Sequence, residues 1–124
     1  MYPAESNHLL GLDELAQPAI RFFVARRDGA PVACGALRID AGYGEIKRMY
    51  VMPEARGQGL GRAILARIED EARHRGLRLL RLETGIRQAE ALALYHASGY
   101  KNCAPFGEYR SDPLSRFMEK QLPN

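Results

Sequence analysis

The sequence predicts a mixed α+β (α/β) fold, in which a mostly antiparallel sheet contains one central β-α-β crossover and carries helices on both faces. Two observations predict this class. Runs rich in β-branched and aromatic residues are joined by tight turns early in the chain, and the apolar period then changes to four residues. A strand-helix-strand connection within one sheet is right-handed and joins parallel strands. We therefore expect the order β-β-β-α-β-α-β, with the third and fourth strands parallel and the other pairs antiparallel.

The first three strands form a meander joined by short turns. They are expected over residues 20–26, 32–39 and 43–51. The dipeptides Asp28-Gly29 and Ala41-Gly42 mark the turns between them. Ahead of the meander, leucines between residues 9 and 15 predict a short helix that ends near Pro18.

The middle of the chain predicts an amphipathic helix that begins at Leu60. Apolar residues recur every four positions from Leu60 to Ala72, and charged residues occupy the other faces. Gly76 is expected to cap the C-terminus of this helix. Leucines crowd the next strand, residues 77–84, which we therefore expect to be buried on both faces.

A second helix and a final strand complete the expected order. The helix is expected over residues 88–98 and ends at Gly99, and the strand is expected near residues 115–122. A loop that contains Pro105, Gly107 and Pro113 separates these two elements.

Length and composition point to a single domain, residues 1–124, because two cores in so short a chain would each bury too little apolar surface. The net charge is +3 without a block of like charge, which does not favour a nucleic-acid partner. No apolar run reaches the roughly 20 residues that span a bilayer, and no secretory signal is visible. We therefore expect a cytoplasmic protein without a membrane partner. The two cysteines and three histidines lack metal-ligand spacing, so no metal is expected.

The segment Arg56-Gly57-Gln58-Gly59-Leu60-Gly61-Arg62 carries the clearest chemical signal. It lies between a strand and the start of the long helix, where free N–H groups and a partial positive charge receive phosphate. Its glycines allow a ligand to approach the backbone closely. The segment lacks the Lys-Ser/Thr of a P-loop and fails the GxGxxG spacing, which disfavours nucleotide hydrolysis and a dinucleotide fold. An anion site and a glycine-rich connection without a ligand are the two interpretations left open.

Three motifs in sequence order resemble those of the Gcn5-related N-acetyltransferase (GNAT) family. Arg56-x-x-Gly59-x-Gly61 matches its Q/R-x-x-G-x-G/A signature. Val51-x-Pro53-Glu54 before it and Leu94-Tyr95…Gly99-Tyr100 after it match two further family motifs. Other stretches look like a bacterial subgroup of small acetyltransferases. The resemblance covers residues 43–100 and implies the acyl-CoA N-acyltransferase fold, with acetyl-CoA as co-substrate.

The resemblance also implies a binding mode for acetyl-CoA. The pyrophosphate would lie on backbone amides of the glycine-rich segment, and the pantetheine arm would pair with the open edge of the third strand. Gln88 stands where the family often has an asparagine and would reach the same ligand. The cofactor-binding residues implied in this way are Met49, Tyr50, Val51, Arg56, Gly57, Gln58, Gly59, Leu60, Gly61, Arg62 and Gln88.

Two side chains are candidates for acid–base catalysis. Tyr95 falls where the family often has the general acid that protonates the departing thiolate, and a core tyrosine is the alternative interpretation. Glu45 lies eleven residues before Arg56. That is the spacing of the general base in the histone-acetylating branch, and a surface glutamate paired with Lys47 or Arg48 is the alternative.

The walls of the acceptor site are less well defined by the sequence. Strand alternation places one set of third-strand residues on one face (Glu45, Lys47, Met49 and Val51) and another set on the opposite face (Ile46, Arg48 and Tyr50). The segment from Phe106 to Ser115 is expected to form a lid over the acceptor site. Family members usually place a strand and one or two helices before the first strand expected here, so we expect a shortened N-terminus. A sheet edge left bare would favour a homodimer.

Two functions follow as hypotheses. The first is an acetyl-CoA-dependent N-acetyltransferase that transfers an acetyl group directly to the primary amine of a small molecule or peptide in a ternary complex. The second is a coenzyme A-binding module without a working acceptor site. Glu45 and Tyr95 favour the enzyme, whereas the missing N-terminal elements favour the module.

Overall fold

The structure, a computed structural model, describes residues 19–123. Its elements in chain order are β1 (Ile20–Arg27), β2 (Ala30–Asp40), β3 (Tyr43–Val51), the 3₁₀ helix η1 (Pro53–Ala55), α2 (Leu60–His74), β4 (Leu79–Gly85), α3 (Ala89–Ala97), β5 (Lys101–Asn102) and β6 (Ser115–Gln121). The expected order is confirmed, and the bounds differ from the expected ones by a few residues at most. The short helix expected before Pro18 lies outside the described residues.

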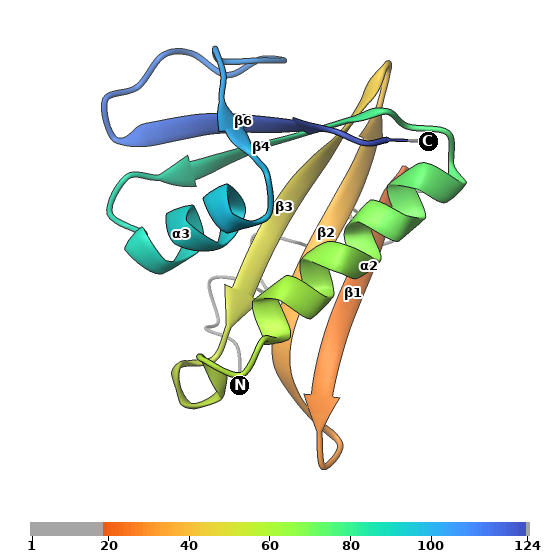
Figure 1. Cartoon of the computed structure of the whole chain (residues 1–124), viewed down its shortest axis with the longest axis vertical. Helices are drawn as coiled ribbons and strands as arrows, with labels where there is room; N and C mark the ends of the chain where they lie inside the picture. The colour runs from red at the N-terminus through yellow and green to blue at the C-terminus, as the bar shows by residue number, and fades with distance from the viewer. Residues whose placement is uncertain (1–18, 124) are drawn as a thin grey trace.

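The strands form one mixed sheet in the order β1-β2-β3-β4-β6-β5 (Figure 1). As expected, β3 and β4 are parallel, and the other neighbouring pairs are antiparallel. The two-residue strand β5 was not expected, because a segment that short carries no periodic pattern. It pairs with β6 and lies at one edge of the described sheet, and β1 lies at the other.

Two helices pack against this sheet within the described residues. Figure 1 shows α2 running across β1, β2 and β3, and α3 lying beside β4 and β6. The buried side of α2 is formed by Ile64, Leu65, Ile68 and Ala72, at the period predicted from the sequence. Tyr95 of α3 joins the same core cluster. Neither helix is long and apolar enough to cross a bilayer.

Both helices end in the same backbone motif. Gly76 follows α2 with a φ of 78°, and its N–H bonds the carbonyl of Arg73, while the N–H of Leu77 bonds the carbonyl of Ala72. This pair of bonds defines a Schellman motif, which needs a left-handed residue and therefore favours glycine. Gly99 ends α3 in the same way. Both glycine stops predicted from the sequence are confirmed.

A β-bulge interrupts the pairing of β2 with β3. Cys34 pairs with Tyr50 and Ala36 pairs with Lys47, so β3 holds one residue more than β2 between these pairs. Arg48 lies in the extra stretch and has a left-handed φ of 58°, a conformation that residues other than glycine seldom adopt. A bulge of this kind bends a strand and changes the direction in which its side chains point.

The bulge overturns the predicted assignment of faces on β3. Ile46, Met49 and Val51 all contact the core under the helices, whereas Glu45 and Lys47 line a separate cavity. The prediction that Glu45 and Lys47 share a face with Met49 and Val51 is therefore wrong. The prediction fails because the extra residue of the bulge, between positions 47 and 49, reverses which face of the sheet the alternate side chains point to.

Candidate functional site

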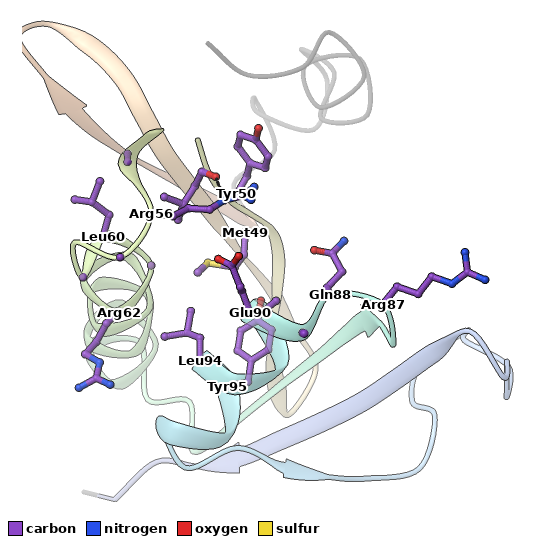
Figure 2. A pocket seen from close by; sticks show the side chains of 17 residues that line it. Met49, Tyr50, Arg56, Leu60, Arg62, Arg87, Gln88, Glu90, Leu94 and Tyr95 are labelled. Atoms are coloured by element: carbon purple, nitrogen blue, oxygen red, sulfur yellow. Dashed lines mark hydrogen bonds between the residues drawn. The ribbon is translucent and has the colours of Figure 1, made fainter. Parts of the chain in front are cut away.

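The main cleft opens where β3 and β4 part. These strands pair at three positions, Gly44–Ile46 with Leu80–Leu82, and no further pairing joins them in the described chain. Their C-terminal ends point apart in Figure 1. A cleft of about 570 Å³ lies beyond this point, between the end of β3, the N-terminus of α2 and one side of α3 (Figure 2). This volume falls within the range of small-molecule sites.

The head of α2 forms one wall of the cleft. Gly57 and Gly59 have φ values of 77° and 79°, and Gly59 is the N-cap of α2. No side chain caps this helix among the described residues, and its first turn contains no acidic residue. The first N–H groups of α2 are thus available to a ligand, and they favour an anion.

Gly61 sets how closely α2 approaches α3. A Cβ atom built on Gly61 would lie 3.0 Å from Cδ2 of Leu94 on α3. Both residues line the cleft. The small size of Gly61 therefore keeps the first turn of α2 near the face of α3.

Three arginines reach the cleft from different elements. Arg62 lies in the first turn of α2, and Arg56 precedes it and donates from Nε to the carbonyl of Val51 at 2.9 Å. The guanidinium of Arg56 also lies 5.9 Å from the centre of the Tyr50 ring. Arg87, before α3, was not predicted as a site residue. Figure 2 shows the side chains of Arg62 and Arg87 at opposite rims of the cleft, extending outward, so the three arginines place positive charge around its opening.

The structure brings together all but one of the predicted cofactor-binding residues. The exception is Gln58, whose side chain accepts a hydrogen bond from Arg27 and donates one to the carbonyl of Glu54. Gln88 lines the cleft just before α3, as predicted. Glu90 lines it too and was not predicted. Glu90 lies four residues before Leu94, so the helix predicted over residues 88–98 places both on one side, and this spacing could have indicated Glu90.

Tyr95 contacts both the core and the cleft. Its side chain is buried, and its ring meets Tyr100 edge-on at 5.8 Å. Figure 2 shows it projecting from α3 into the cleft near Leu94 and Met49. Burial raises the pKa of the Tyr95 phenol above its ordinary value of 10.0, so the hydroxyl carries a proton at neutral pH. Tyr95 is thus a core residue that also lines the cleft, and its role as a general acid stays a prediction.

Glu45 lies in a second cavity rather than in the main cleft. This cavity has a volume of about 390 Å³ and is lined by Arg38, Asp40, Tyr43, Glu45, Lys47, Gly107, Glu108 and Tyr109. The Glu45 side chain is only 5% exposed and accepts a hydrogen bond from the Tyr109 hydroxyl at 2.5 Å. Among the described residues, no ion pair joins Glu45 to Lys47. Glu45 is therefore not a surface glutamate.

An aromatic cluster holds the loop that carries Tyr109 over this cavity. Phe106 is buried and meets Tyr43, Tyr109 and Phe117 with ring centres 5.2–5.9 Å apart. The N–H of Tyr109 bonds the carbonyl of Phe106 at 3.0 Å, which closes a tight turn. Arg81 lies over the rings of Tyr43 and Phe106. The loop therefore covers Glu45, and its role as a lid over the acceptor site stays a prediction.

The comparisons with known proteins agree with this geometry. The model of the acetyltransferase (GNAT) family matches residues 1–100. A protein named IAA acetyltransferase from Azospirillum brasilense is 60% identical over 124 residues, which are 98% of this chain and 81% of that protein. The N-acetyltransferase YsnE of Bacillus subtilis is 40% identical over 125 residues, with 98% of this chain and 83% of that protein covered.

Solved structures show the same fold. A protein from Klebsiella pneumoniae assigned to the acyl-CoA N-acyltransferases superposes with a TM-score of 0.84 at 45% identity, covering 90% of this chain and 79% of that chain. The PaiA N-acetyltransferase of Thermoplasma acidophilum, solved with coenzyme A, gives a TM-score of 0.75 at 24% identity over 83% of this chain and 61% of that chain. The acyl-CoA N-acyltransferase fold expected from the sequence is confirmed. The chain therefore belongs to the GNAT family of N-acetyltransferases.

Proposed function

We propose that this protein uses acetyl-CoA to acetylate the primary amine of a small molecule or peptide, by direct transfer in a ternary complex. The observation that carries the proposal is the gap between β3 and β4, which opens onto the uncapped head of α2. A ligand with phosphates at one end and amide groups along an extended arm fits both features at once. The family membership and the coenzyme A complex of the Thermoplasma protein support this choice.

The main cleft would hold the coenzyme in two parts. The pyrophosphate would lie on the N–H groups at the head of α2, near the charges of Arg56 and Arg62. The pantetheine arm would lie along Met49–Val51, where β3 has no partner strand on the side of β4. A backbone N–H in this stretch would polarise the thioester carbonyl, as an oxyanion hole does.

The chemistry needs one proton acceptor and one proton donor. In our proposal Glu45 accepts a proton from the substrate ammonium, directly or through water, and frees the amine lone pair. The amine nitrogen then bonds the thioester carbon and loses its second proton to solvent as the carbon–sulfur bond breaks to leave a thiolate. Tyr95 gives its proton to that thiolate, and the burial that raises the pKa of its phenol keeps the proton available until then. Solvent then returns a proton to Tyr95 and takes the proton from Glu45.

A coenzyme A-binding module is the second candidate function. One observation favours it: Glu45 lies in a cavity apart from the cleft that holds Tyr95, and its carboxylate already accepts a bond from Tyr109. A module of this kind would bind acetyl-CoA but would not release coenzyme A thiol from it in the presence of any amine.

The release of coenzyme A thiol from acetyl-CoA, measured against a panel of primary amines, separates the two functions. The proposal expects turnover with at least one amine. The substitution Tyr95→Phe should lower kcat by about a hundredfold, the smaller end of what a positioned acid contributes, while coenzyme A affinity changes little. An unchanged kcat would remove Tyr95 from the mechanism, and coenzyme A binding without turnover of any amine would leave the module.

Three smaller proposals accompany the activity. We propose that the protein is bacterial, like its Azospirillum and Bacillus relatives, and that it acts in the cytoplasm, where acetyl-CoA is supplied.

We also propose a homodimer, because β1 is an edge strand of the described sheet and such edges readily pair. Sedimentation equilibrium across a concentration series would show twice the chain mass if the dimer forms.

A further inference from the structure

The second cavity carries opposite charges on neighbouring positions. Glu45 and Lys47 are two residues apart on β3, and both residues line the cavity. Alternate residues of a strand lie about 7 Å apart on one face. A carboxylate and an ammonium are thus presented side by side to whatever enters.

Neither charge is neutralised by an ion pair within the described part of the chain. Glu45 accepts its hydrogen bond from the neutral Tyr109 hydroxyl. Lys47 is half-buried, and no described carboxylate lies within 4.0 Å of its ammonium. Arg38 stands opposite Glu45 on β2, and its nearest carboxylate is Asp40 at 3.9 Å, in a surface pair that contributes little.

The lining also holds Asp40, which lies beside Arg38, and Glu108. A simple alkylammonium ion would gain from Glu45, but Lys47, two residues away on the same strand, would repel it. A negative group elsewhere on the same molecule would instead be attracted by Lys47 and Arg38. The cavity volume of about 390 Å³ lies at the small end of ligand sites, which suits a short compound.

We propose that this cavity is the acceptor site and that it selects an amine that also carries an anionic group. The ammonium lies beside Glu45 and the anion beside Lys47 and Arg38. Because Glu45 and Lys47 are only two residues apart on β3, the substrate has a short carbon chain between its two charged groups. This inference rests on the proposed function and adds the substrate class to it. Either a carboxylate or a phosphonate would supply the negative charge that lies beside Lys47 and Arg38.

Matched pairs of amines test the proposal. γ-Aminobutyrate is compared with n-butylamine, and β-alanine with n-propylamine, so that a carboxylate replaces a methyl group in each pair; 2-aminoethylphosphonate covers the other anion. The readout is kcat/KM from thiol release at saturating acetyl-CoA. The anionic member of at least one pair is expected to be preferred by about tenfold or more, as for a hydrogen bond to a charged group.

Two charge variants locate the origin of the preference. Lys47→Met should reduce the kcat/KM ratio between the carboxylate-bearing amine and its alkylamine partner by about tenfold. Lys101→Met removes the same charge from an exposed position on β5, outside the cavity, and should preserve the ratio.

The outcomes distinguish this inference from the function on which it rests. Acetylation of the simple alkylamines as fast as their anion-bearing partners, or a ratio unaltered by Lys47→Met, overturns the substrate class and leaves the enzyme in place. If no amine is acetylated although coenzyme A raises the Tm, the proposed function fails and the acceptor site fails with it.

Discussion

The Tyr109 hydroxyl lies 2.5 Å from Oε2 of Glu45, although 64 positions separate the two residues in the chain. The bond joins the loop before β6 to the first half of β3, and it orients a carboxylate that is 95% buried. Burial, together with the bond to Glu45, raises the pKa of the Tyr109 phenol above its ordinary value of 10.0. The donor therefore keeps its proton throughout the neutral range.

Removing this donor should impair acetyl transfer without weakening coenzyme binding. Tyr109→Phe retains the ring contacts with Phe106 and Phe117 but leaves Glu45 without its bond. We expect kcat/KM for the amine to fall about tenfold, because the carboxylate is no longer held in one orientation. Steady-state kinetics measures this change, and titration with coenzyme A serves as the control. Wild-type kinetics in this variant would show that Tyr109 does not position Glu45.

The contact of β2 with α2 depends on a glycine. A Cβ atom on Gly35 would lie 2.6 Å from Sδ of Met49 and 2.7 Å from Cγ2 of Ile64. Gly35→Ala should therefore reduce the free energy of unfolding by about 1–3 kcal/mol, as overpacked cores do. The matched control is Gly85→Ala, where the nearest contact would be an ordinary 3.7 Å. Equal stability of the two variants in urea denaturation would contradict the packing described here.

Alkaline pH should destabilise the protein through two buried tyrosines. Burial raises the pKa of Tyr95 above 10.0, and burial together with Glu69 raises that of Tyr100. Above pH 10 the unfolded chain loses these protons and the folded chain keeps them, so the folded state binds more protons and stability falls as pH rises. The stability that these groups contribute is fully present below pH 10. Each contributes at most about 1.4 kcal/mol per pH unit.

The pH dependence can be assigned to one side chain. Urea denaturation of the wild type and of Tyr95→Phe at pH 9 and pH 11 gives two differences in the free energy of unfolding. The difference should be smaller in Tyr95→Phe, because one of the shifted groups is absent. Identical differences would place the alkaline effect elsewhere.

Much of the fold could be predicted because local patterns and tertiary packing agree. The four-residue apolar period from Leu60 to Ala72 predicts a helix, and the same residues are buried against the sheet. Gly76 and Gly99 mark the helix ends because the Schellman motif requires a left-handed residue. The glycine-rich segment likewise predicted one wall of the cleft, because glycines ahead of an amphipathic helix indicate accessible backbone N–H groups at its head.

The remaining features arise from contacts that no local pattern records. The left-handed Arg48 follows from the pairing of β3 with β2, and arginine has no intrinsic preference for that conformation. Tyr109 meets Glu45 because Phe106 anchors a long loop across the sheet. No local sequence pattern can indicate a contact between residues that lie so far apart in the chain. Arg87 lines the cleft from the turn before α3, where an isolated charge is usually solvated.

Amide chemical shifts test the central claim most directly. ¹H–¹⁵N spectra are recorded while coenzyme A is added to ¹⁵N-labelled protein. The shifts should concentrate at Gly59, Gly61 and Arg62 at the head of α2 and at Met49 and Val51 on the open side of β3. Absence of any shift at saturating coenzyme A, or shifts confined to residues outside this cleft, would contradict the site.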